Sequence, residues 1–147
     1  MDANSPFTEQ EMAMLRPVFL TSGREHLETM GRLQGELPGL VPDGDALKQF
    51  HRAIHSLKGA ALQMGFLQIG GLAGLLERVV LVLQESMPDD DGRWQTLLQQ
   101  GHTALDTALT ATEQETGFTP AGELVTELEQ WLAQCEQSAS GEQCASG

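Results

Sequence analysis

The spacing of apolar residues constrains the fold of this chain more than any other feature. Between about Asp45 and Met64, apolar side chains recur at intervals of three and four: Leu47, Phe50, Ile54, Leu57, Ala61 and Met64. An α-helix brings residues at these intervals onto one face. The segment is therefore predicted to be an amphipathic helix with this stripe turned toward a core.

Signals for a helix start and for a break occur near the N-terminus. Thr8 and Glu11 have the spacing of a capping box, which predicts that a short helix begins there. Pro17 is expected to end or kink that helix, or to lie in the first turn of a second one.

Three further helices are predicted from the same periodicity. They are expected over about residues 67–86, around 94–109 and from about 120 to 132. The segments 35–44 and 87–92 are rich in proline, glycine and aspartate, and they are predicted to be loops.

These predictions together indicate an all-α protein. Helices joined by short connections favour an up-and-down four-helix bundle, with one additional helix or a short N-terminal helix. Residues 1–137 are expected to form one domain. Residues 138–147 are small and polar, and a disordered tail is predicted for them.

Charge and composition exclude some classes of function. A net charge of −13 argues against nucleic-acid binding, which needs a basic face to neutralise phosphates. The apolar run at 79–83 is far shorter than the ~20 residues that span a bilayer, so no membrane association is expected. Cys135 and Cys144 lack metal-ligand spacing, and a reducing cytoplasmic location is predicted.

His55 stands out on the helix predicted around Ile54. It is rotated off the apolar stripe, and Gly59 and Leu62 continue its flank one and two turns later. A glycine inside a helix costs roughly 0.5–1 kcal/mol relative to alanine, so its presence at position 59 needs a reason. One reason is access of a bulky partner to the histidine ring.

Basic residues gather on the same helix. The chain has only eight lysines and arginines, yet Lys48, Arg52 and Lys58 lie within two turns of His55. Such a setting favours an anion near the imidazole. Each feature also has an ordinary explanation, since flank histidines and lysines are commonly solvated and a glycine can serve helix packing.

A family resemblance adds to this interpretation. The segment resembles the histidine phosphotransfer (HPt) domain, and most closely the first domain of chemotaxis-type histidine kinases. The matching residues are Phe50, Arg52, Ala53, His55, Ser56, Leu57, Lys58, Gly59, Gly65 and Phe66. The core of the resemblance covers about residues 17–86.

The resemblance implies a role for several residues. His55 would be the phosphoacceptor, and Lys58 would help to neutralise the phosphoryl charge. Gly59 would leave room for the partner, and Gly65 would end the helix. Glu77 matches the carboxylate that orients the histidine ring by accepting a hydrogen bond from its other nitrogen.

The resemblance also implies the kind of partner. The chain would be a covalent phosphoryl carrier rather than a turnover enzyme, and no cofactor is expected. Its partners would be response-regulator receiver domains and a sensor histidine kinase, hybrid or chemotaxis-type. Lys48, Arg52 and Leu62 would form the docking surface on the flank of His55.

Two other interpretations remain open. The chain could be a non-catalytic docking module that kept the fold and lost the chemistry. His51 and His55, at i and i+4, could instead hold a metal ion, but no third ligand is evident and no metal is expected. His51 is assigned no role, and Gly74 replaces a second histidine often found in the chemotaxis kinases.

Overall fold

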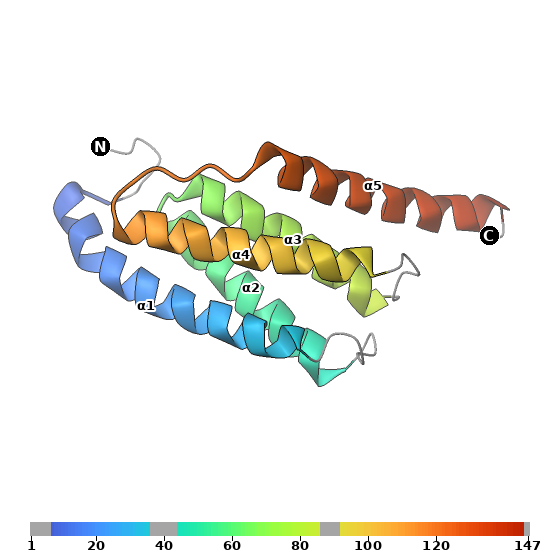
Figure 1. Ribbon diagram of the computed structural model, residues 1–147, viewed down its shortest axis with the longest axis horizontal. Coiled ribbons are helices and arrows are strands. Elements are labelled where there is room, and N and C mark those ends of the chain that lie inside the picture. Colours follow the sequence, from blue (N-terminus) through green and yellow to red (C-terminus); the bar gives the residue numbers. More distant parts are fainter. Residues whose placement is uncertain (1–6, 36–43, 86–91, 146–147) are drawn as a thin grey trace.

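The computed structural model describes residues 7–35, 44–85 and 92–145, with side chains through residue 136. These residues form five α-helices, and no strand occurs among them: α1 (Glu9–Gln34), α2 (Asp45–Gln63), α3 (Leu67–Glu85), α4 (Arg93–Glu113) and α5 (Gly122–Ala145). The prediction of an all-α protein is therefore confirmed (Figure 1).

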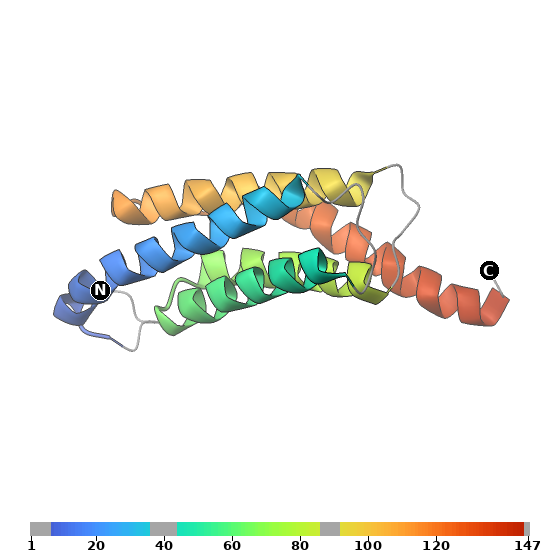
Figure 2. The ribbon, with the colours of Figure 1, turned by 90° about the horizontal axis from the view of Figure 1, so that it is seen from below.

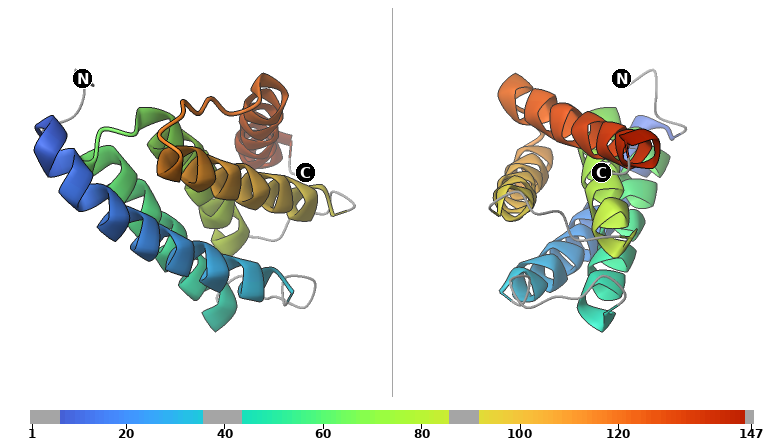
Figure 3. Two further views of the ribbon diagram at one scale, coloured as in Figure 1. Left: turned by 60° about the vertical axis from the view of Figure 1, so that its left-hand side comes forward. Right: turned by 90° about the vertical axis from the view of Figure 1, so that its right-hand side faces the viewer.

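The first four helices close into a bundle. Helix α1 packs on α2 and α4, and α3 packs on the same two helices from the other side. Consecutive helices run in opposite directions (Figures 1 and 2). Helix α5 lies outside this bundle, against α3 and α4 (Figure 3). The additional helix thus follows the bundle in the sequence.

Helix α1 begins at the predicted capping box. The Thr8 hydroxyl oxygen accepts from the Glu11 amide at 3.1 Å, and the Thr8 amide donates to the Glu11 carboxylate at 2.9 Å. The prediction that one helix ends at Pro17 and a second begins there is wrong, because α1 continues through it; the alternative of a kink stays a prediction. Proline removes one helical hydrogen bond. The apolar side chains of Met12 and Phe19 are buried on either side of it and hold both parts of α1 on the core.

The predicted apolar stripe on α2 is buried in the bundle. Phe50, Ile54 and Leu57 are each fully buried. The helix ends in a Schellman arrangement, in which the Gly65 amide donates to the Leu62 carbonyl and the next amide to the Ala61 carbonyl. Gly65 has a φ of +82°, which suits glycine because it has no Cβ to clash.

Helix α5 covers one side of the bundle with Leu124, Leu128, Trp131 and Leu132, all of which are buried. Its backbone reaches Ala145 and so enters the segment 138–147 for which a disordered tail is predicted. The side chains of that segment lie outside the described residues, and the tail stays a prediction.

One described helix is long and apolar enough to cross a membrane by composition alone. This helix is α3, and half of its apolar segment is buried inside the bundle. Central helices of globular bundles have the same composition, so their length and hydropathy alone are weak evidence for a membrane span.

Candidate functional site

The site lies between α2 and α3, and a glycine on α3 lets these helices approach closely. A Cβ on Gly70 would lie only 2.7 Å from Cγ of Leu62 on α2. A Cβ on Gly74 would make ordinary contact with the Lys58 side chain, at 3.5 Å. Glycine at position 70 therefore allows close packing of α2 and α3 two turns before Glu77.

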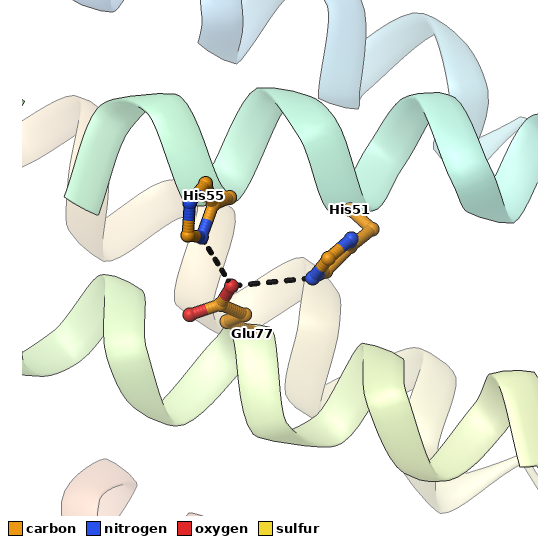
Figure 4. A group of neighbouring side chains, drawn as sticks. All are labelled: His51, His55 and Glu77. Atoms are coloured by element: carbon orange, nitrogen blue, oxygen red, sulfur yellow. Dashed lines mark hydrogen bonds and ion pairs between the residues drawn. The ribbon is translucent and has the colours of Figure 1, made fainter. Parts of the chain in front are cut away.

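His55 and Glu77 meet across this contact (Figure 4). His55 Nδ1 lies 2.6 Å from Glu77 Oε2. Because an ionised carboxylate only accepts hydrogen bonds, Nδ1 carries the proton and donates. In the neutral ring the lone pair is then on Nε2. The His55 side chain is 62% exposed, so a partner in solution can reach it.

Glu77 is buried and serves three donors. Besides His55, it accepts from His51 Nε2 at 3.2 Å and from Lys58 Nζ at 2.5 Å, the latter on Oε1. Burial alone would raise the pKa of Glu77, but the hydrogen bonds and charges of Lys58 and His55 outweigh it and lower the pKa. Glu77 is therefore ionised at neutral pH and can hold the ring of His55.

Lys58 and Gly59 lie one turn after His55, as the sequence requires. Lys58 points to Glu77 in this state, so its amine is held next to the histidine ring. Gly59 is exposed, and no atom lies within 4 Å of the position that a Cβ would occupy there. Packing inside the bundle thus gives no reason for glycine at this position.

Sequence reasoning missed His51, to which it assigned no role. Its ring lies beside that of His55, with centroids 5.9 Å apart, and it shares Glu77 Oε2 with that ring. The i, i+4 spacing of the two histidines was a visible signal. Their common acceptor, Glu77, could not be identified from this spacing, because it lies on another helix. The donor atoms of His51, His55 and Glu77 all lie within 4.8 Å of one another.

Most cations are paired with carboxylates, and two of the exceptions among the described residues lie on α2, the helix of His55. Five of the eight lysines and arginines form ion pairs with carboxylates: Arg16, Arg24, Lys58, Arg78 and Arg93. Within the part of the chain that the structure describes, Arg32, Lys48 and Arg52 have no such pair.

Two of these unpaired cations line one groove. Arg32 on α1 and Arg52 on α2 face the groove between these helices, which also includes Ser56, the neighbour of His55. Sequence reasoning missed Arg32, because no local pattern relates α1 to the histidine. Leu62 lies on the predicted flank of α2, and it is 45% exposed although it also packs on Gly70.

Comparison with protein families agrees with this geometry. The family model described as the Hpt domain matches residues 14–115, which span most of α1 and all of α2, α3 and α4. No curated protein and no solved structure matches the chain. The chain belongs to the Hpt domain family, and its role is histidine phosphotransfer in two-component signalling.

Proposed function

We propose that this protein is a phosphorelay intermediate that carries a phosphoryl group on His55. One observation supports the assignment most: an exposed imidazole whose Nδ1 donates to a buried carboxylate at 2.6 Å. The group would pass between aspartates of receiver domains, or come from the kinase domain of a hybrid or chemotaxis-type sensor kinase. A cytoplasmic location is part of this proposal.

The chemistry follows from the tautomer. The Nε2 lone pair of His55 attacks phosphorus, and the bond from phosphorus to the donor's aspartyl oxygen breaks. The aspartate leaves as a carboxylate with the bonding electrons. The ring becomes positively charged while Nδ1–H still donates to Glu77, so the negative carboxylate stabilises the product. No proton has to leave, and the chain needs no cofactor of its own.

Lys58 is proposed to neutralise the new phosphoryl charge. Phosphorylation brings about −1.5 to −2 charges, more than the ring alone can balance. The Lys58 amine is already near the ring because Glu77 holds it on Oε1. The Lys58 side chain is 29% exposed, so it has room to turn toward a phosphoryl group.

The proposed docking surface is the flank of α2 around His55. Gly59 leaves it open, Leu62 offers an apolar contact, and Lys48 and Arg52 offer unpaired positive charge. Arg32 extends this charge onto α1. A receiver domain, whose phosphorylation pocket is acidic, has the complementary charge. Gly65 is proposed to act only by ending α2 where α3 must turn back.

The experiment is phosphorylation by a small phosphoramidate, followed by intact-mass measurement. Wild type should gain one phosphoryl group that is labile in acid and stable in base, and His55→Gln should gain none. His26→Gln is the matched control and should be labelled like wild type. If wild type stays unlabelled with this donor and with a phosphorylated receiver, the alternative of a non-catalytic docking module replaces the carrier.

A further inference from the structure

The second histidine gives this site a capacity that phosphotransfer does not use. We propose that His51, His55 and Glu77 form a binding site for a divalent transition-metal ion such as Zn²⁺, and that the bound ion prevents phosphorylation of His55. The proposed metal binding does not depend on the proposed function, whereas the proposed inhibition rests on it.

The donor set is one that zinc prefers. Two imidazoles one turn apart on α2 and a carboxylate from α3 converge, with all donor atoms within 4.8 Å (Figure 4). Three protein ligands of this type, with water as the fourth, are common in accessible zinc sites. Both imidazole side chains are partly exposed, at 28% for His51 and 62% for His55, so an ion can enter from solvent.

The two nitrogen–oxygen distances to Glu77 need only small changes to accommodate zinc, and the two imidazole nitrogens lie no more than 4.8 Å apart. Zinc bonds to nitrogen and oxygen are about 2.0–2.2 Å long, so tetrahedral ligands are roughly 3.3–3.5 Å apart. His51 Nε2 already lies 3.2 Å from Glu77 Oε2. His55 Nδ1 lies at 2.6 Å and must retreat. The His55 ring can do so because it is the most exposed of the three side chains.

The nearest positive charge to the proposed ion is the amine of Lys58. Its amine lies on Oε1 of Glu77, whereas both imidazoles lie on Oε2. The ion would therefore take the oxygen that Lys58 does not use. The lysine still repels a cation. Lys58→Gln should consequently bind Zn²⁺ more tightly than wild type, provided that Glu77 stays in place.

Metal binding and phosphorylation need opposite tautomers of His55. A metal on Nδ1 takes that nitrogen's lone pair, and the ring proton moves to Nε2. Phosphorylation needs the lone pair on Nε2 and the proton on Nδ1. In the neutral ring only one nitrogen carries the proton, so the two states exclude each other.

Binding is tested with metal-free protein titrated with Zn²⁺ and followed through the imidazole resonances of the histidines. These resonances separate the site from any binding by cysteine thiols. His51→Gln retains a hydrogen-bond donor for Glu77 but loses the ligand, and it should bind at least about tenfold more weakly than wild type. His51→Ala should behave alike, and His26→Gln should match wild type.

Inhibition is tested by phosphoramidate labelling with and without saturating Zn²⁺. Zinc should slow labelling of wild type at least about tenfold and leave His51→Gln unaffected at the same concentration. Equal zinc affinity of wild type and both His51 variants, or unchanged labelling of zinc-saturated wild type, would overturn the proposal. Unlabelled metal-free wild type would contradict the carrier function alone, because the titration still reports binding.

Discussion

Replacing Gly59 by alanine separates the stability of α2 from access to His55. Gly59 is exposed in the middle of the helix, and an added Cβ meets no atom within 4 Å. The methyl group therefore causes no clash, and the helix gains the propensity difference of about 0.5–1 kcal/mol. For a chain of this size the melting temperature should rise by about 1–4 °C.

The same methyl group should hinder a large partner and spare a small one. The proposed docking flank includes Gly59, one turn from His55. Phosphoryl transfer from a receiver domain to Gly59→Ala should therefore be slower than to wild type, and slower still to Gly59→Leu. Labelling by phosphoramidate, which needs little space, should keep the wild-type rate.

Gly71→Ala is the matched control. Gly71 is also an exposed helical glycine with no atom near the Cβ position, but it lies on α3. The Gly71→Ala substitution should stabilise the fold by a similar amount and leave both transfer reactions unchanged. A loss of stability in Gly59→Ala would refute the packing argument. Equal receiver transfer in Gly59→Leu and Gly71→Ala would refute the access argument.

Three further perturbations test the packing and the charges. Gly101→Ala should destabilise the fold in urea by about 1–3 kcal/mol, less the helix-propensity gain, because its Cβ would lie 2.7 Å from Cδ1 of the buried Leu76. Leu128→Ala should cost about 2–5 kcal/mol if α5 is part of the cooperative unit. The pKa of Glu77 in the folded protein is lowered from 4.5, so ionisation of Glu77 stabilises the fold above that pH. This contribution to stability is lost as the pH falls through the lowered pKa. The stability advantage of wild type over Glu77→Gln should accordingly shrink below about pH 4.5.

Local patterns in the sequence predict the helices well. The stripe of α2 is buried, and the capping box starts α1 at Thr8. Both depend on residues within one or two turns of each other, where helical geometry alone decides which side chains meet. Pro17 shows the limit of local reasoning, because its cost is outweighed by burial of side chains from other parts of α1.

Contacts between helices can be predicted from the sequence only in part. The pairing of His55 with Glu77 was expected from the family resemblance, not from periodicity. The position of His51 on the same carboxylate and of Arg32 beside Arg52 depends on how the helices cross and rotate. Periodicity identifies the inner face of a helix, but it does not say which outer residues of two helices face each other.

The distribution of charge is compatible with the proposed docking of so acidic a chain on an acidic partner. At physiological ionic strength, charges more than about 8 Å apart are largely screened. The net charge of −13 therefore has little effect at a docking contact, and the charges within that distance dominate. On the proposed docking surface these include Arg52 and Lys48, which have no carboxylate partner among the described residues. Because most other cations are neutralised by ion pairs, the attraction is confined to the side where transfer would occur. It should weaken as salt is added, while the Glu77–Lys58 contact, which is largely buried, should not.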